Sequence, residues 1–398
     1  MHVLIQQSVL FNSIQSVGRA VPQKPPHPVL SNIKIEADED HLIFTGFDLS
    51  FGIEFRTSDC LIRQHGSACL PAKLLINIIS KQDSNSNIEM IIDENNQCTL
   101  TCDSIEYQIA GMPTDEYPAN LAESFYENQE NVPDDYKEFV VNSNDLLLAA
   151  KNTVFAASQD DTKQILTGVN FEITLSRLTV AATDGHRLAV INVNPEQELE
   201  LNIDEGEKLI NLTIPAKILK ELERMLIQTK APSVSLIEGN DNLMFKIVTD
   251  TVAATLTCRS LNGQYPNYPQ LIPDQDKFVT VLTIERKTLL KSIEKIATIL
   301  DEKTQKLILF TFDYDNQQVK LSAETESVGK CFELLPCQLS GNDLEAVALR
   351  CNYLLDGLKT IDSNEIQIKF SGETNPCVVI PLSNIDMIYL IMPVKIRK

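Results

Sequence analysis

The chain has 398 residues, 43% of them hydrophobic, which predicts two or three domains rather than a single core. Lys and Arg number 34 and Asp and Glu 55, so the formal charge is 34 − 55 = −21. This charge excludes a protein that binds nucleic acid over its whole surface, although it permits a basic strip within an acidic exterior. Nine scattered cysteines without a Cys-x-x-Cys pair indicate reduced thiols in the cytosol and no zinc or other metal site.

The N-terminal apolar run consists only of Val3, Leu4 and Ile5, which is too short for the core of a signal peptide. No other apolar run in the sequence is long enough to span a bilayer. We therefore expect a cytoplasmic protein without membrane contact.

Two kinds of segment recur along the chain, which is typical of an internal repeat. In the first kind, a short strand leads into an apolar helical stretch, and its copies begin at His2, Glu138 and Lys277. Copies of the second kind begin at Leu70, Ile214 and Leu349. The first two copies of the second kind share Pro-Ala-Lys, in which a proline suits the start of a helix.

Apolar residues at helical spacing predict one buried face on each of three helices. These residues are Leu74, Leu75, Ile78 and Ile79; Ile218, Leu219, Leu222 and Leu226; and Leu289, Leu290, Ile293 and Ile296. Alternating segments around the turns at 37–40 and 313–316 predict hairpins. Each repeat is thus predicted to be an α+β unit, with polar linkers at 124–135 and 262–276. The alternative is two ordinary α+β domains that resemble each other by chance.

The stretch AATDGHRLAVINV, from Ala181 to Val193, carries the most information. Asp184, Gly185 and His186 predict a turn between two strands, with Gly185 at positive φ and the side chains of His186 and Arg187 at its edge. Asp184 and His186 are also a candidate acid–base pair for a hydrolase. However, the sequence has no HExxH motif, no Gly-rich phosphate loop and no nucleophile in a strained turn nearby. It therefore predicts no catalytic residue and no cofactor.

The same stretch closely resembles the signature of the DNA polymerase III beta subunit family, the bacterial sliding clamps, in the central domain of that family. Four other places carry the resemblance, namely MPTDEYP at 112–118, the helix starts at Pro71 and Pro215, NGQYPNY at 262–268 and YLIMPVK at 389–395. The resemblance covers the whole chain in order. It implies three similar clamp domains at 1–126, 137–268 and 274–398, each with two helices packed on antiparallel sheets, and a six-domain ring formed by a homodimer.

The resemblance also implies a function in DNA replication without catalysis. A clamp of this family is a processivity factor that encircles double-stranded DNA of any sequence and tethers the replicative polymerase. The implied protein partners are the DNA polymerase III alpha subunit, the clamp loader, other DNA polymerases and repair proteins, all bound through short peptide motifs. Two alternatives stay open, a hydrolase that uses Asp184 and His186, and a cytosolic peptide-binding scaffold that does not bind DNA.

Three sets of site residues follow from the resemblance. A mostly apolar partner-peptide groove between the second and third domains is expected at Leu166, Thr183, Gly185, His186, Arg187, Leu188, Pro266, Leu271, Met392, Pro393 and Val394. DNA contacts are expected at Lys24, Lys73, Lys217, Lys220, Arg224, Lys287, Lys291 and Lys295, of which the last six also form stripes at helical spacing. The dimer interface is expected at Leu74, Ile78, Tyr107 and Ile109, facing Ile299 and Leu300.

The chain departs from the family's pattern at four places, where its contacts are expected to differ. The departures are Gln164 and Ile165 in place of paired tyrosines, Gln270 in place of an arginine, an acidic run reduced to Glu324 and Glu326 before Lys330, and the additional C-terminal residues Arg397 and Lys398.

Overall fold

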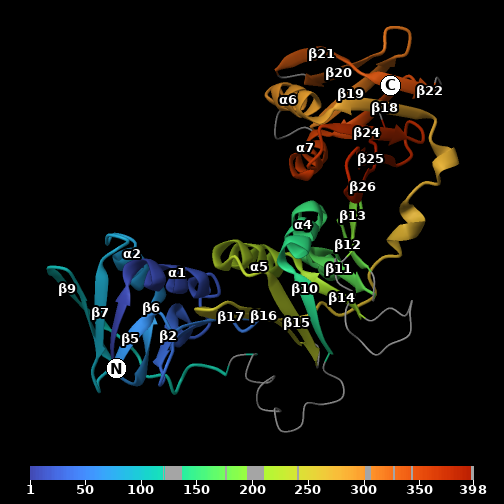
Figure 1. Ribbon diagram of the computed structural model, residues 1–398. Coiled ribbons are helices and arrows are strands. Elements are labelled where there is room, and N and C mark those ends of the chain that lie inside the picture. Colours follow the sequence, from blue (N-terminus) through green and yellow to red (C-terminus); the bar gives the residue numbers. More distant parts are fainter. Residues whose placement is uncertain are drawn as a thin grey trace. The chain divides into compact units, whose positions relative to one another are not determined.

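A computed structural model of the protein (Figure 1) describes residues 1–119, 121, 137–174, 177–194, 210–239, 242–300, 306–325, 328–341 and 344–395. The expected linker at 124–135 and the residues Glu326, Arg397 and Lys398 lie outside these ranges. The chain forms two compact units, one of Met1–Leu146 with Lys217–Ser260 and one of Leu147–Ala216 with Leu261–Lys398. Among the described helices, none combines the length and apolarity that a membrane crossing requires.

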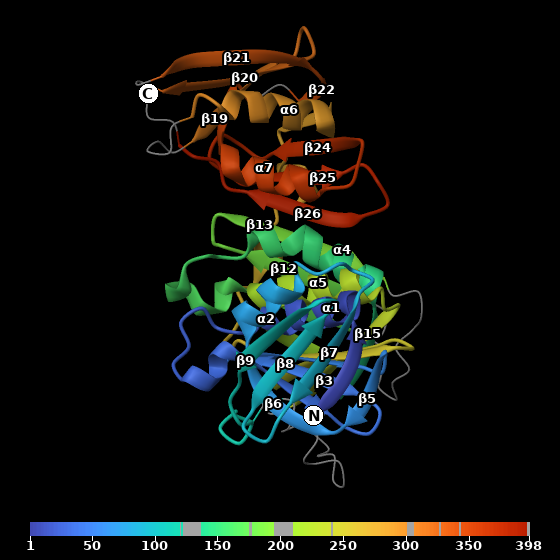
Figure 2. The same cartoon turned by 90° about the vertical axis from the view of Figure 1, so that its left-hand side faces the viewer.

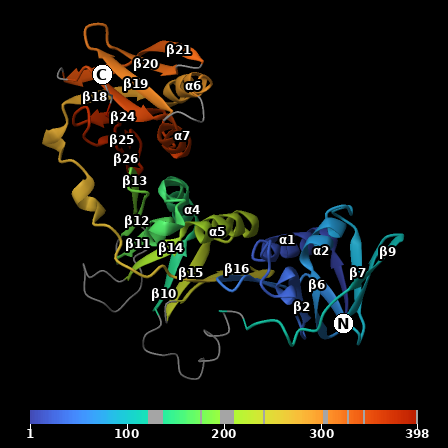
Figure 3. The same ribbon diagram turned by 180° about the vertical axis from the view of Figure 1, so that it is seen from behind.

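The first unit contains a five-stranded antiparallel sheet in the order β5-β1-β7-β8-β9. Its strands are β1 (His2–Gln6), β5 (Cys60–Gln64), β7 (Asn87–Ile92), β8 (Gln97–Cys102) and β9 (Ile105–Ala110). Two helices, α1 (Gln7–Gly18) and α2 (Ala72–Ile79), pack against each other in this unit (Figure 3).

The second sheet of this unit has eight strands in the order β10-β15-β16-β17-β4-β3-β2-β6. They are β2 (Asn32–Ala37), β3 (Leu42–Phe47), β4 (Phe51–Thr57), β6 (Gly66–Pro71), β10 (Lys137–Asn142), β15 (Ser233–Gly239), β16 (Asn242–Val248) and β17 (Val252–Arg259). The antiparallel pairing of β17 with β4 joins the second sequence repeat to the first. The helix α5 (Ala216–Thr229) and the short 3₁₀ helix η1 (Pro28–Ser31) complete the unit.

The second unit contains a nine-stranded sheet in the order β14-β11-β12-β13-β26-β25-β24-β18-β22. These strands are β11 (Gly168–Ile173), β12 (Leu178–Thr183), β13 (Arg187–Val193), β14 (Ile210–Pro215), β18 (Thr280–Glu285), β22 (Gln338–Gly341), β24 (Glu365–Phe370), β25 (Cys377–Pro381) and β26 (Asp386–Ile391). Figure 2 shows β13 of the second repeat beside β26 of the third, and the two strands pair antiparallel.

A four-stranded sheet, β21-β20-β19-β23, lies in the same unit. Its strands are β19 (Leu307–Asp313), β20 (Gln318–Thr325), β21 (Gly329–Pro336) and β23 (Ala346–Arg350). The helices are α6 (Arg286–Ala297) and α7 (Cys351–Thr360), with α4 (Ser143–Thr153) beginning in the first unit. Short 3₁₀ helices are η2 (Val154–Ala156), η3 (Asp161–Thr167), η4 (Tyr268–Leu271) and η5 (Gln275–Lys277).

The predicted repeat of strand and helix is present three times. The first kind of segment forms β1-α1, β10-α4 and β18-α6, and the second kind forms β6-α2, β14-α5 and β23-α7. The α+β class with antiparallel sheets is confirmed. One detail was wrong, because Pro71 and Pro215 end their strands and the helices begin one residue later, at Ala72 and Ala216. Both prolines still spare the helix an unpaired N–H at its first turn.

The expected apolar faces of α5 and α6 are buried, except that Leu290 is only partly so. The buried residues are Ile218, Leu219, Leu222, Leu226, Leu289, Ile293 and Ile296. On α2 the expected stripe divides, because Leu75 and Ile79 are buried while Leu74 is 47% exposed and Ile78 is half-buried. The outward side of α2 therefore offers apolar surface that its own sheet does not cover.

Each of the three predicted turns is closed by an aspartate at its first or second position. The Oδ1 atoms of Asp38, Asp184 and Asp313 accept hydrogen bonds from backbone N–H groups two or three residues further on, at 2.7–3.0 Å. Asp and Asn favour this position because their short side chains reach these groups. Gly185 has the positive φ expected of it, +91°.

Gly357 permits α7 to approach β26 closely, since a Cβ atom there would lie 2.2 Å from Cε1 of the buried Tyr389. Gly357→Ala gains helix propensity of about 1 kcal/mol, but the overpacking costs about 1–3 kcal/mol. Because the two effects partly offset each other, we expect a net loss of up to about 2 kcal/mol in the free energy of unfolding, measured by urea denaturation. Asn352→Ala, at an exposed position of the same helix, is the control. A Gly357→Ala protein as stable as the control would contradict this packing.

Candidate functional site

The turn between β12 and β13 is held by its own side chains. The Oδ1 atom of Asp184 accepts from the N–H groups of His186 (2.8 Å) and Arg187 (3.0 Å). The hydroxyl of Thr183 donates to the carbonyl of Arg187 (2.6 Å) and accepts from the N–H of Gly185 (3.1 Å). With these backbone groups bonded, the turn presents exposed Gly185 and His186 in one fixed conformation.

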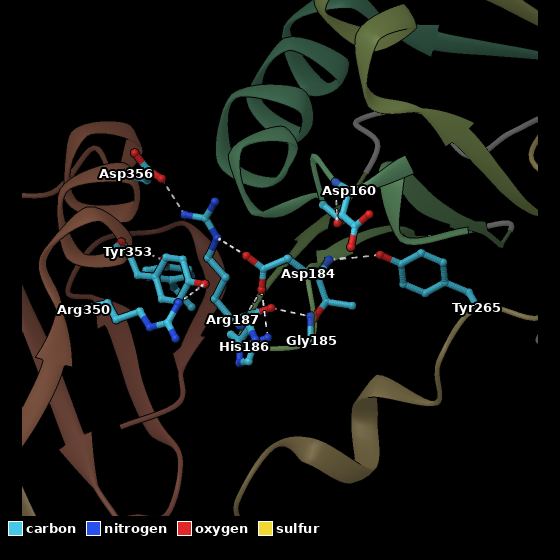
Figure 4. A network of polar contacts seen from close by, with 12 residues as sticks. Asp160, Asp184, Gly185, His186, Arg187, Tyr265, Arg350, Tyr353 and Asp356 are labelled. Carbon is cyan, nitrogen blue, oxygen red and sulfur yellow. Dashed lines mark hydrogen bonds and ion pairs between the residues drawn. The ribbon is translucent and has the colours of Figure 1, made fainter. Parts of the chain in front are cut away.

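Arg187 is not at the edge of the turn, as expected, but inside the protein, with 8% of its side chain exposed. Its Nε donates to Oδ2 of Asp184 at 3.0 Å, and its Nη1 donates to Oδ2 of Asp356 on α7 at 2.5 Å (Figure 4). The guanidinium carbon lies 4.6 Å from the ring centroid of Tyr353 and 5.7 Å from that of Phe155. Two carboxylates and two rings thus surround a cation that links the turn to α7.

The surroundings of Arg187 keep it charged. Burial alone would lower its pKa, but the nearby Tyr389 hydroxyl and the carboxylates of Asp356 and Asp184 outweigh burial and raise it. Tyr389 is itself buried, which raises its pKa, and its hydroxyl donates to the carbonyl of Tyr353 at 2.7 Å. A neutral tyrosine and a charged arginine therefore sit together where β26 meets α7.

The acid–base pair considered for a hydrolase does not exist as such. Both oxygens of Asp184 are occupied by the turn and by Arg187, and His186 contributes its backbone groups to the hydrogen bonds described. Within the described ranges, no group of three His, Cys, Asp or Glu side chains is placed to hold a metal ion. Asp184 therefore serves the structure of the turn and the charge of Arg187.

The structure brings the turn together with the C-terminal segment. The N–H of Met392 donates to the carbonyl of His186, and the N–H of Val394 to the carbonyl of Ala348, both at 2.9 Å. Met392 also packs on an apolar cluster that contains Leu188. Segments about 200 positions apart in the sequence thus form one surface.

The expected groove residues differ in how much surface they offer. Leu271 is 50% exposed, and Leu166, Pro266, Met392, Pro393 and Val394 are partly exposed. Leu188 and Thr183 are 1% and 4% exposed, so their side chains support this surface from beneath and have almost no area of their own to contribute. Leu188 therefore belongs to the core of this unit.

Residues 262–276 do lie between β17 and β18, but they are packed on the sheet and are not a free linker. The hydroxyl of Tyr265 accepts a hydrogen bond from the N–H of Thr183 at 3.0 Å. Tyr268 is 5% exposed in the same cluster as Leu188, and its burial raises its pKa to about 12. These two tyrosines fix the segment that leads into the third repeat.

Four residues around Arg187 were missed in the sequence analysis. They are Arg350, Tyr353, Asp356 and Tyr389. Tyr353 and Asp356 are three apart on α7 and so share a face of that helix, which was a usable signal. Nothing local to α7, however, indicated that this face meets the turn at Asp184.

The basic residues fall into two groups. Three of the expected DNA contacts are engaged within the chain, as Lys217 with Asp48 (3.6 Å), Arg224 with Glu221 (2.5 Å) and Lys295 with Glu333 (2.9 Å). The other five are exposed and form no ion pair with any described residue. These are Lys24, Lys73, Lys220, Lys287 and Lys291. The freely available positive charge is therefore concentrated on the second group.

Three family models together match almost the whole chain. They describe the DNA polymerase III beta subunit, with its N-terminal domain at residues 1–122, its central domain at 140–267 and its C-terminal domain at 269–395. The chain belongs to the DNA polymerase III beta subunit family. The beta sliding clamps of Synechocystis sp. and Synechococcus elongatus are 36% and 34% identical over 414 and 400 residues, covering 100% of both chains in each comparison. The crystal structure of the sliding clamp from Bacillus subtilis, 26% identical, matches with a TM-score of 0.85 over 100% of both chains.

The chain therefore has the three-domain clamp fold and is a non-catalytic processivity subunit of DNA polymerase III. Its partners include DNA and a polymerase. The hydrolase alternative is excluded on these grounds, in agreement with the engaged carboxylate of Asp184.

The residues expected at the dimer interface lie close to two sheet edges, β9 and β21. Leu74 is exposed, and Ile78, Tyr107, Ile299 and Leu300 are partly exposed. Ile109 is 2% exposed, because its side chain turns into the first unit's own core, so it has no surface for an interface. On β21, Phe332 (63%) and Leu334 (52%) are the exposed apolar residues that the sequence analysis missed.

Replacing Arg187 with Met should destabilise the second unit, because it leaves two carboxylates without their cation. Breaking a buried ion pair costs about 3–5 kcal/mol, and the 44% exposure of Asp356 reduces this to about 2–3 kcal/mol. Urea denaturation of Arg187→Met measures the loss. Arg177→Met, which removes an exposed pair with Asp386, is the control and should cost less than about 1 kcal/mol. Equal effects of the two changes would contradict the central position of Arg187.

Proposed function

We propose that the chain acts as a head-to-tail homodimer that encircles double-stranded DNA of any sequence. The observation that carries this proposal is the pair of sheet edges. Within the described part of the chain, β9 and β21 each end a sheet and pair on one side only. An unpaired edge is a template for another strand, and the two edges differ in sequence. Joining β9 of one copy to β21 of the next would extend both sheets and close a ring at two copies.

The proposed domains are 1–126, 137–268 and 274–398, so the ring would contain six. The available lysines support a DNA-facing side on the helices. Lys220 is on α5, and Lys287 and Lys291 are one turn apart on α6. In a chain of charge −21, such local cations attract phosphates while the remaining surface repels them. Lys217, Arg224 and Lys295 attract phosphates less strongly, because each of them already pairs with a carboxylate of the chain.

The surface formed by the turn and the C-terminal segment is proposed as the site for short peptide motifs. Its proposed partners are the DNA polymerase III alpha subunit, the clamp loader, other DNA polymerases and repair proteins. Half-exposed apolar side chains such as Leu271 and Met392, next to a rigid polar turn, suit the anchoring of short peptides. Gln164 and Ile165, on η3, stand where the family has paired tyrosines, so a stacking contribution of such tyrosines to DNA binding is absent from the proposal. A peptide-binding scaffold without DNA binding is the remaining alternative.

The test of encirclement separates topology from affinity. A binder that relies on six or more phosphate contacts loses roughly a thousandfold in affinity between about 50 and 200 mM salt. We expect the chain, once loaded on closed circular DNA by a clamp loader, to persist at high salt and to leave soon after the circle is cut. Protein retained on DNA with free ends, or washed from intact circles at moderate salt, would contradict encirclement. Lys220→Glu with Lys291→Glu should weaken loading, and a scaffold would not load at all.

The test of the dimer uses the side of the interface in the third repeat. Ile299→Ala with Leu300→Ala removes partly exposed apolar surface beside β21, and we expect monomers because association depends on burying that surface. Light scattering after gel filtration measures the mass. The control is Leu382→Ala, which truncates an equally apolar residue, 46% exposed, directly after β25. A double variant that remains dimeric would show that these two residues are not in the interface.

A further inference from the structure

Arg350 is the last residue of β23, directly before α7, and it is partly buried. Its Nη1 donates to the hydroxyl of Tyr353 at 3.4 Å, and its guanidinium carbon lies 5.5 Å from the centroid of the Tyr353 ring (Figure 4). Stacking on an aromatic ring restricts a long side chain without neutralising it. Arg350 is therefore a cation held in a defined position.

The position of Arg350 is next to the proposed peptide site. Ala348, two residues earlier on β23, accepts the hydrogen bond of Val394. Tyr353 stacks against Arg350 and also against Arg187, which belongs to the turn. Arg350 is thus linked to both segments of the proposed site, to the turn through Tyr353 and to the C-terminal residues through Ala348.

The two arginines on Tyr353 differ in how their charge is balanced. Arg187 has two carboxylates, Asp184 and Asp356. Arg350 has no carboxylate partner among the described residues, and its only recorded side-chain contact is with Tyr353. If Asp184 or Asp356 paired with Arg350, an existing interaction would be lost. Asp184 closes the turn, and Asp356 on α7 binds Arg187. A guanidinium that pairs with no carboxylate of the described residues is suited to an acid from outside.

We propose that Arg350 selects docking peptides that carry an acidic side chain, Asp or Glu, beside their apolar anchors. This inference rests on the proposed peptide site and adds a specificity-determining residue to it. A guanidinium binds a carboxylate through charge-assisted, often bidentate, hydrogen bonds, and its position on Tyr353 lowers the entropy lost on binding. The apolar anchors provide most of the affinity, and Arg350 provides the discrimination.

The test measures discrimination rather than affinity alone. The probes are fluorescent pentapeptides of Leu, Phe and Gln, acetylated and amidated, in which one position at a time is Asp, Asn or Lys. Anisotropy with the full-length protein gives each dissociation constant. At low salt we expect the best Asp peptide to bind about fivefold more tightly than its Asn twin, a preference that shrinks at high salt because the pair is partly exposed.

Arg350→Gln should abolish this preference, so that the Asp and Asn peptides bind the variant with equal dissociation constants, and Arg350→Lys should retain part of it. Lys369→Gln, a partly exposed cation on β24 of the same unit, is the control and should retain all of it. An Asn peptide with a free C-terminus tests whether a terminal carboxylate can replace an acidic side chain. If this peptide binds as tightly as the Asp peptide, the proposal that the carboxylate comes from a side chain is wrong.

The possible failures are distinct. If Asp and Asn peptides bind equally to the unmodified protein, or if Arg350→Gln keeps the preference, the role of Arg350 is wrong although the peptide site stands. If no peptide binds, the peptide site itself fails and this inference fails with it. A melting temperature of Arg350→Gln equal to that of the unmodified protein verifies that the variant is folded.

Discussion

Backbone pairing between sequence repeats is the constraint on which the rest of this structure depends. β17 of the second repeat pairs with β4 of the first, from Val252↔Thr57 to Cys258↔Phe51, and β13 pairs with β26 of the third, from Arg187↔Ile391 to Asn192↔Asp386. Among the described strands, the second repeat therefore has no sheet that belongs to it alone, which is why the compact units divide inside it. Ladders of this kind need no particular side chains, so they survive extensive change of sequence.

A buried or partly buried arginine reinforces each junction. In the first unit, Arg19 at the end of α1 lies 2.8 Å from Glu221 on α5, and burial lowers its pKa despite the attraction of that carboxylate. In the second unit, Arg187 meets Asp356 on α7. Each pair joins residues of neighbouring repeats, and an arginine that is deprived of its acid inside a protein is strongly unfavourable. The ladders set the register of the repeats, and these ion pairs penalise any slip that separates them.

Local sequence patterns were sufficient to predict the helices, strands and turns, but not to predict which of these elements contact one another. Helical spacing identified the buried faces of α5 and α6, and Asp-led turns identified three hairpins, because both signals arise within a few residues. The burial of Arg187 was missed, since it depends on Asp356 and Tyr353, more than 160 positions away. Ile109 was assigned to an outer surface. Alternation along β9 shows only that the side chains of Ile109 and Gln108 point to opposite faces of the sheet, and it does not show which face the rest of the unit covers. The resemblance supplied the site as a set of positions, and only the fold showed which side chains reach the surface.

The difference between β9 and β21 has a consequence for how copies accumulate. A contact that joins unlike edges is directional, so it closes into a ring only when the rotation at each step completes a circle after a whole number of copies, and otherwise it continues as a helical filament. In the proposed ring, the rotation per copy depends on the twists of the shared ladders at β17–β4 and β13–β26 as well as on the contact between copies. A bulge introduced into either ladder would change that rotation at every step, and the product would be a fibre of native subunits rather than an unfolded protein.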